Sequence, residues 1–419
     1  MMTIREKIFN TYLQHPKVSI DTRKLQSGEI FFALKGDRFD GNEFVEAALE
    51  NGCALVVGEK EWANERYVQV KDALIALQEL ALDYRNTWQI PVLSITGSNG
   101  KTTTKELIRD VLATQKKVYA TRGNLNNHIG IPLTILETPA DTEIAIIEMG
   151  ANHQREIAGY CQYARPTHGI ITNIGKAHLE GFGGILGVQK GKRELYDYLQ
   201  AHQGVIFCNP NQPYMDEWRD IFNPIVYGTE NFSIEIVPDG MRVHWLSEGL
   251  VFNSKLAGAY NVNNIAAALV IGQYFGISPN SAIAAISAYV PENMRSQWKR
   301  TERNQLIIDA YNANPTSLEN AIRNLAAHDG ADKLAIIGAM KEMGEFEEAE
   351  HQKVVEILKE LGLNAVLIGR EFEKVKNDFP FYPNVEAYLE VLSEQPLGDK
   401  LILIKGSRGI QLEKVLPFL

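Results

Sequence analysis

The feature that most constrains the fold is a glycine-rich turn that joins a short apolar run to a helical run. The apolar run is Val92–Thr96, and residues 97–102 read Gly-Ser-Asn-Gly-Lys-Thr. Glycine lets the backbone wrap closely round a phosphate, and the unpaired N–H groups of a helix start attract anions. The full Walker pattern places a glycine where Ile95 stands, so the turn is a shortened variant. We therefore predict a strand, a phosphate-binding loop and a helix in succession.

Residues of this loop have separate expected roles. Lys101 should reach the β- and γ-phosphates of a nucleotide, and the hydroxyl of Thr102 should hold Mg²⁺. A chance glycine-rich turn is the alternative, and the position between a strand and a helix disfavours it. The residues predicted to contact the nucleotide here are Gly97, Ser98, Asn99, Gly100, Lys101, Thr102 and Thr103.

Strand-like and helical runs alternate along most of the chain. Glu143–Glu148 and His168–Thr172 resemble buried parallel strands, and a second alternating block starts near Pro291. This order predicts an α/β protein with mostly parallel sheets, whose ligands bind at the carboxyl ends of the strands. We predict an N-terminal domain at 1–88, a central P-loop domain at 89–291 and a Rossmann-like α/β domain at 292–419.

Composition disfavours several classes of protein. The net charge of −10 argues against a nucleic-acid partner, which usually requires a basic excess. No apolar run approaches the ~18 residues of a membrane helix, and residues 1–10 lack the apolar core of a signal peptide. Cys53, Cys161 and Cys208 are widely spaced, which favours buried reduced thiols over disulfides or a zinc site. We expect a cytoplasmic enzyme without membrane insertion.

Two further motifs lie outside the phosphate loop. One is Asp21–Arg23, followed by residues 28–36 and 39–42, and the other is Gly123–Pro132. Together with the shortened loop they resemble the Mur ligase family of ATP-dependent amide ligases, in which the first is similar to the N-terminal uridine-nucleotide module and the second to a run typical of one ligase type. Amide side chains in that run suit a sugar-pyrophosphate substrate because they donate and accept together. Turns and plain polar loops are the alternatives. The substrate contacts that the resemblance implies are Thr22, Arg23, Asn42, Asn126, Asn127, Asn312 and Arg408.

The resemblance also implies two Mg²⁺ ions. Glu148 ends a predicted strand, where its carboxylate is expected to complete the shell of the ion held by Thr102. In the family, a histidine at the position of His178 helps to bind the second ion. The alternatives are a solvent-facing acid and a structural histidine.

A carbamylated lysine is the third implied feature. Residues 187–195 match the segment that carries it in the family, and spacing assigns the role to Lys192, with Lys190 as the rival. Composition alone describes both as surface lysines. The implied catalytic set is Lys101, Glu148, His178 and Lys192, and the implied metal ligands are Thr102, Glu148, His178 and Lys192.

Further motifs lie on the adenine side and in the last block. Asn261 and Asn264 share one helical face and are expected to read a base edge, although Asn261 could instead cap the helix. By resemblance, Arg295 meets phosphate, Asp309 meets ribose or metal-bound water, and Arg408 meets the acceptor carboxylate. The polar run at 296–300 departs from the family pattern.

The resemblance implies one reaction. ATP would activate the carboxylate of UDP-N-acetylmuramoyl-tripeptide as an acyl phosphate, which D-alanyl-D-alanine then attacks, giving the pentapeptide, ADP and phosphate. The enzyme is expected to be a monomer. The alternatives are a Mur-type ligase that adds a single amino acid, a folate ligase, a non-catalytic relative and a P-loop motor or switch. The N-terminal module disfavours the folate ligase, and the presence of Lys101, Glu148 and Lys192 disfavours a non-catalytic relative.

Overall fold

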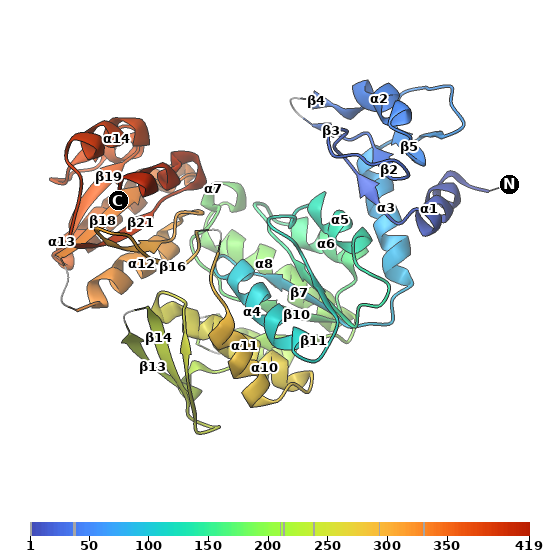
Figure 1. Ribbon diagram of the computed structural model, residues 1–419. Helices are drawn as coiled ribbons and strands as arrows, with labels where there is room; N and C mark the ends of the chain where they lie inside the picture. The colour runs from blue at the N-terminus through green and yellow to red at the C-terminus, as the bar shows by residue number, and fades with distance from the viewer. Residues whose placement is uncertain are drawn as a thin grey trace.

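The computed structural model describes residues 2–419 except 37, 38, 210, 213, 238, 293, 330 and 331. Three sheet-centred units follow one another along the chain, and the first and last lie on opposite sides of the middle one (Figure 1). The predicted α/β class with parallel sheets is confirmed. In the described part of the chain, no helix combines the length and apolarity needed to cross a bilayer.

The first unit is a small parallel sheet with the order β1-β2-β5-β6. In the sequence, the runs Ile30–Leu34 and Ala54–Val57 predict two of its strands to within two residues, and the helical spacing of Ala73–Asn86 predicts its last helix. The sheet strands are β1 (Val18–Ser19), β2 (Ile30–Phe32), β5 (Leu55–Gly58) and β6 (Tyr67–Gln69), and the hairpin is β3 (Lys35–Gly36) and β4 (Phe39–Asp40). The helices are α1 (Ile4–Gln14), α2 (Val45–Glu50) and α3 (Ala73–Asn86).

The middle unit is a six-stranded parallel sheet with the order β12-β11-β10-β7-β9-β8. Every residue of β7 and β9 is buried, as the apolar runs predicted. The strands are β7 (Val92–Thr96), β8 (Val118–Ala120), β9 (Ile144–Glu148), β10 (His168–Ile171), β11 (Val205–Cys208) and β12 (Ile225–Val226). The helices are α4 (Lys101–Ala113), α5 (Gly130–Leu136), α6 (Glu156–Ala164), α7 (Leu179–Phe182), α8 (Ile185–Ala201), α9 (Met215–Phe222), α10 (Val262–Tyr274) and α11 (Pro279–Ala288).

A three-stranded antiparallel sheet projects from this unit beside α10 and α11 (Figure 1). It consists of β13 (Phe232–Val237), β14 (Gly240–Trp245) and β15 (Leu250–Ser254). Met241, Val243 and Trp245 pack into the same apolar cluster as helices α4 and α10. This sheet is not among the elements predicted from the sequence. All three cysteines are buried, as predicted.

The last unit is a six-stranded sheet with the order β16-β17-β21-β18-β19-β20, parallel except for the edge strand β16. The polar run at 296–300 that departs from the family pattern contains this edge strand, whose last two residues, Lys299 and Arg300, are exposed. The strands are β16 (Gln297–Arg300), β17 (Gln305–Ile308), β18 (Asp332–Gly338), β19 (Asn364–Ile368), β20 (Phe381–Tyr382) and β21 (Lys400–Lys405). The helices are α12 (Pro315–Ala327), α13 (Glu347–Glu360) and α14 (Val385–Glu394).

Candidate active site

The phosphate loop follows β7, the strand at which the strand order of the middle sheet switches from one side to the other. Strands β9 and β8 follow on one side of β7, and β10 to β12 follow on the other. Loops that leave the carboxyl ends of adjacent strands separate at such a point and open a crevice for a ligand. The loop after β7 therefore occupies the position where nucleotides bind in open α/β sheets.

Two glycines of the loop are required by its shape. Gly97 and Gly100 have φ of 144° and 79°, which disfavours residues with a side chain. A Cβ at Gly97 would lie 2.0 Å from the Thr172 hydroxyl, and one at Gly100 would lie 2.7 Å from the side-chain oxygen of Asn264. The loop can therefore lie directly against β10 and α10 only because these positions are glycine.

Lys101 is the first residue of α4, and its ammonium folds back onto the loop. It donates to the carbonyl oxygens of Gly97 and Ser98. Burial lowers its pKa to about 8, with Arg295 acting in the same direction and Glu148 opposing both. An ammonium held this way is a compact positive charge beside the space that the loop encloses.

Glu148 ends β9 and faces the start of α4. Its Oε1 accepts from Thr102 Oγ1 at 3.2 Å and from Asn126 Nδ2 at 2.8 Å. Its Oε2 lies 3.3 Å from Lys105 Nζ, an ion pair in which both side chains are 2% exposed. That contact is not aligned as a hydrogen bond. Burial alone would raise the pKa of Glu148, but Lys105, Lys101 and Asn126 outweigh it and hold the pKa below its usual value.

Asn261 and Asn264, the amides predicted to read a base edge, hydrogen-bond to each other. Asn261 Nδ2 donates to the carbonyl oxygen of Ala257 at 2.7 Å, and its side-chain oxygen accepts from Asn264 Nδ2 at 2.8 Å. Asn264 in turn accepts from Thr104 Oγ1 at 3.0 Å. The Asn261 side chain makes no capping hydrogen bond to α10, so the capping alternative is wrong.

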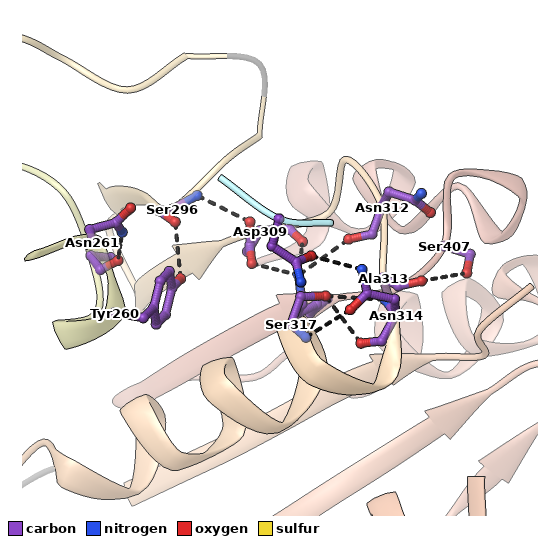
Figure 2. A network of polar contacts seen from close by, with 12 residues as sticks. Tyr260, Asn261, Ser296, Asp309, Asn312, Ala313, Asn314, Ser317 and Ser407 are labelled. Atoms are coloured by element: carbon purple, nitrogen blue, oxygen red, sulfur yellow. Dashed lines mark hydrogen bonds and ion pairs between the residues drawn. The ribbon is translucent and has the colours of Figure 1, made fainter. Parts of the chain in front are cut away.

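Residues of the last unit reach the same space (Figure 2). Asp309 accepts from Ser296 N–H at 3.2 Å and pairs with Lys405 Nζ at 2.6 Å. The guanidinium of Arg295 lies 3.6 Å above the ring of Tyr311. Because Arg295 also influences the pKa values of Lys101 and Glu148, its charge lies close to the phosphate loop.

His178 and Lys192 are placed differently from each other. His178 Nδ1 pairs with Glu342 of the last unit. Lys192 is 1% exposed, its Nζ donates to the carbonyl oxygen of Ala151 at 3.3 Å, and it lies 5.2 Å from the Phe182 ring centroid. Burial lowers its pKa well below the ordinary value, and Lys101 adds to that effect. The rival Lys190 is exposed.

One cavity of about 580 Å³ gathers most of the predicted site. It lies between the middle unit and the last unit, and residues of both line it. The predicted residues that line it are Ser98, Asn99, Gly100, Lys101, Thr102, Thr103, Asn126, Asn127, Glu148, His178, Asn261, Asn264, Arg295, Asp309 and Asn312. Asn127 also uses its side-chain oxygen locally, to accept from the N–H groups at the start of α5.

A second cavity of about 140 Å³ adjoins the first and shares His178, Asn312 and Asn314 with it. Arg408 and Lys341 line this smaller space. Both come from the last unit, Glu342 lines the same space, and Lys341 Nζ pairs with Glu371.

The predicted contacts of the first unit are not among the residues that line either cavity. The Arg23 guanidinium forms a bidentate pair with Asp21 and is exposed. The side chain of Asn42 is buried, accepting from Glu59 N–H at 2.8 Å and donating to Asp40 at 2.8 Å. Thr22 is half-buried. For these three residues, contact with substrate stays a prediction.

Two lysines of the site were missed. Lys105 lies one helical turn after Lys101, so the i, i+4 spacing was the signal that could have found it. Lys405 is the last residue of β21, the strand beside β17, and Asp309 follows β17 at the same edge of the sheet. Without the strand order, no local pattern joins residues 309 and 405.

Comparison with known proteins agrees with this geometry. Three domain models match: "Mur ligase family, catalytic domain" at residues 17–92, "Mur ligase middle domain" at 95–272 and "Mur ligase, glutamate ligase domain" at 294–408. UDP-N-acetylmuramoyl-tripeptide–D-alanyl-D-alanine ligase of Bacillus subtilis is 35% identical, over 95% of this chain and 92% of its own. The enzyme of the same name from Escherichia coli is 32% identical over 95% and 92%.

Solved structures of such ligases have the same fold. MurF from Acinetobacter baumannii is 31% identical, with a TM-score of 0.86 over 96% of this chain and 92% of its own. MurF from Thermotoga maritima, solved in complex with ADP, is 26% identical, with a TM-score of 0.88 over 97% of both chains. From the matched domains, the phosphate loop and the shared fold, the chain belongs to the Mur ligase family.

Proposed function

We propose that this chain is an ATP-dependent ligase that joins D-alanyl-D-alanine to UDP-N-acetylmuramoyl-tripeptide in the synthesis of peptidoglycan precursors. The observation that carries the proposal is the 580 Å³ cavity, where the phosphate loop, Glu148 and the C-terminal residues Arg295 and Asp309 face one space. Relatives that bear this activity in their names match the chain over nearly its whole length.

The reaction has two steps. A carboxylate oxygen of the tripeptide attacks the γ-phosphorus of ATP, the bond from that phosphorus to the β-phosphate oxygen breaks, and ADP leaves. The amine of the dipeptide then attacks the acyl carbon, phosphate leaves with the bonding electrons, and the nitrogen gives up a proton. Lys101 and Arg295, which line the same cavity, would both neutralise charge on the transferring group.

The residues fit one Mg²⁺ ion. The Thr102 hydroxyl and the Glu148 carboxylate are adjacent, line the cavity and are oxygen donors of the kind that this ion prefers. When bound, the ion supplies charge neutralisation at the phosphates. Within the described ranges, no three His, Cys, Asp or Glu side chains gather as a metal-binding group, so a second ion would depend on the lysine discussed next.

Lys192 is the proposed site of carbamylation, with His178 as the companion ligand of a second Mg²⁺. Reaction with CO₂ needs a neutral amine, and the depressed pKa of Lys192 favours that form. Burial near Lys101 also agrees with an anionic group at this position. The pairing of His178 with Glu342 and the absence of Lys192 from the cavity lining count against a preformed site.

The lysine proposal is tested by Lys192→Ala assayed with and without short carboxylic acids. Loss of ligation with partial recovery is expected, because an added carboxylate can replace the carbamate oxygens. The exposed Lys190→Ala is the matched control and should keep full activity. Activity lost in Lys190→Ala and kept in Lys192→Ala would mean that the assignment is reversed, and full activity in both would remove the carbamate from the mechanism.

The division of labour among domains is part of the proposal. Residues 1–88, with Thr22, Arg23 and Asn42, bind the UDP end of the precursor; residues 89–291 bind ATP; and residues 292–419 close over ATP and bind the dipeptide. The smaller cavity is the proposed site of the dipeptide carboxylate, which Arg408 and Lys341 would face.

The function is tested with D-alanyl-D-alanine and single amino acids as alternative acceptors. Turnover with the dipeptide alone supports the proposal. Turnover with a single amino acid and none with the dipeptide would move the chain to another Mur-type activity. Heavy oxygen in the substrate carboxylate should appear in the released phosphate if an acyl phosphate forms.

A further inference from the structure

Lys405 is a buried lysine that the proposed mechanism does not use. It is the last residue of β21, which lies between β17 and β18. Its side chain is 2% exposed, although the residue contributes to the lining of the large cavity. A buried ammonium is costly unless it is paired and hydrogen-bonded, so its partners indicate what it does.

The ammonium of Lys405 donates to one segment of the chain, residues 309–312. Its Nζ donates to Asp309 Oδ2 at 2.6 Å, to the Asp309 carbonyl oxygen at 3.4 Å and to the Asn312 carbonyl oxygen at 3.2 Å. An ammonium has three N–H donors, and these contacts match that number. The lysine therefore fixes both a side chain and the backbone path of the segment that follows β17.

Two residues after this segment, the chain reaches the phosphate loop. Asn314 Nδ2 donates to Asn99 Oδ1 at 2.7 Å, a contact between residues 215 positions apart in the chain. Between these ends, the Ala313 carbonyl oxygen accepts from Ser407 Oγ at 3.5 Å. Figure 2 shows the path from Asp309 through Asn312 and Ala313 to Asn314. Lys405 and Ser407 thus both hydrogen-bond to a segment whose end contacts a residue of the nucleotide site.

We propose that Lys405 is a positioning residue that holds segment 309–314 in the conformation that brings Asn314 to Asn99, and so strengthens nucleotide binding. The lysine acts through the segment, which takes its three N–H donors. The inference rests on the proposed function only in taking ATP as the nucleotide.

The test compares Lys405→Met with Lys400→Met in the full-length protein. Methionine keeps the length of the side chain and removes its charge and donors. Lys400 lies at the other end of β21 and pairs with Asp332 at the surface, so it is the matched control. Binding of a non-hydrolysable ATP analogue with Mg²⁺ is measured by calorimetry without tripeptide or dipeptide. We expect about tenfold weaker binding in Lys405→Met, since small misplacements of positioning groups cost that much or more, and no change in Lys400→Met.

A double-mutant cycle separates positioning from a general loss of structure. Asn314→Ser keeps a helix-capping side chain for α12 and removes the donor to Asn99. If Lys405 acts through Asn314, the pair of substitutions weakens binding no more than the stronger single one. In turnover, the KM for ATP should rise more than kcat falls, whereas misfolding would lower kcat alone. If Lys405→Met does not fold, Lys405→Gln takes its place in the cycle.

Unchanged analogue binding in Lys405→Met, or additive effects in the cycle, would overturn the proposal. Ligation by the unaltered protein is assayed separately. A protein that binds the analogue but does not join the dipeptide would contradict the proposed function and leave the inference on Lys405 intact.

Discussion

Glu148 is the carboxylate that interacts with both Lys101 and Lys105. It offsets Lys101 and Lys105 and accepts from Thr102, so its loss should affect both stability and chemistry. These two effects can be separated, because Lys105 is buried against the carboxylate and does not line the cavity.

We predict that Glu148→Gln lowers the free energy of unfolding by about 3 kcal/mol, since it leaves a buried ammonium without its counter-charge. Adding Lys105→Met should recover most of that loss, because a neutral pair replaces the orphaned charge. The kcat should stay at least ~100-fold below that of the unaltered protein in both variants, since the proposed Mg²⁺ ligand is missing. Glu143→Gln, at the exposed start of the same strand, is the control. An active double variant would contradict the metal assignment of Glu148.

His168 offers a pH-dependent test of the core. It begins β10, is buried, and its ring nitrogens lie 2.8 Å from Thr167 Oγ1 and 3.3 Å from the Tyr274 hydroxyl. Burial lowers its pKa to about 4. Below pH 6.5, the ordinary pKa of histidine, His168 becomes protonated in the unfolded chain, whereas in the folded chain it stays neutral down to about pH 4. The contribution of neutral His168 to the free energy of unfolding is therefore fully present above pH 6.5, and it is lost as the pH falls toward 4.

This shift predicts a loss of about 2 kcal/mol of unfolding free energy between pH 7 and pH 5 from His168 alone. Urea denaturation at the two pH values measures it. His168→Gln should reduce the difference, whereas the exposed His202→Gln should leave it unchanged. An equal pH dependence in the unaltered protein and in His168→Gln would show that other groups cause the acid sensitivity.

At the scale of elements, α3 joins the first unit to the middle one through a buried arginine. Arg85 Nε and Nη2 donate to the carbonyl oxygens of Ala164 and Arg165, at 2.9 Å and 2.7 Å, where α6 ends. These are orphan carbonyls of a helix terminus, and Arg165 has the left-handed conformation that often ends a helix.

Arg85→Met should therefore lower the free energy of unfolding by roughly 2–3 kcal/mol, because two charge-assisted hydrogen bonds are lost and the buried Ala164 carbonyl loses this partner. Arg5→Met is the matched comparison. Arg5 joins α1 to α3 through Asp83, but it is 45% exposed, and such pairs contribute less than about 1 kcal/mol. Equal losses in the two variants, measured by chemical denaturation, would contradict the assignment of Arg85 as a buried cap.

Elements with strong local signals were predictable from the sequence. The bounds of α3 and β7 agree with the runs Ala73–Asn86 and Val92–Thr96, because burial on a single face or on both faces leaves a clear pattern. The β13–β15 sheet was missed, and its half-buried first strand carries a weaker signal than the fully buried runs. Its position is set by packing against α10 and α11, which sequence periodicity does not report.

Site residues divide in the same way. Lys101 and Thr102 are positioned by one local turn, so a short motif was enough to place them beside each other. The pairs Lys405–Asp309 and His178–Glu342 join residues 96 and 164 positions apart. Such contacts depend on strand order and on the arrangement of domains, and neither is encoded in a short motif.

At the scale of the whole molecule, the cavity exists only because the last unit rests on the middle one. The two units meet beside the phosphate loop, where Lys176 pairs with Glu350 and the Lys176 N–H donates to Thr316 Oγ1 at 3.0 Å. Gly175 is the residue before Lys176 in the chain. A Cβ at Gly175 would lie 2.8 Å from Thr316 Oγ1 and 3.1 Å from Thr316 Cβ, which is closer than van der Waals packing allows.

Gly175→Ala should therefore separate the two units without harming either one. Thr316 is the second residue of α12, so its short side chain cannot swing far, and the helix itself must move. Because Arg295, Asp309 and Asn314 belong to the displaced unit, we expect kcat/KM for ATP to fall by about tenfold, with little change in melting temperature.

Gly159→Ala is the control: it lies in α6 with no atom within 4 Å of the added Cβ, and alanine favours a helix. Small-angle scattering should show a larger radius of gyration in Gly175→Ala, and Thr316→Ala in the same background should partly reverse both effects. Unchanged kinetics in Gly175→Ala would mean that ATP turnover does not require this contact between the units.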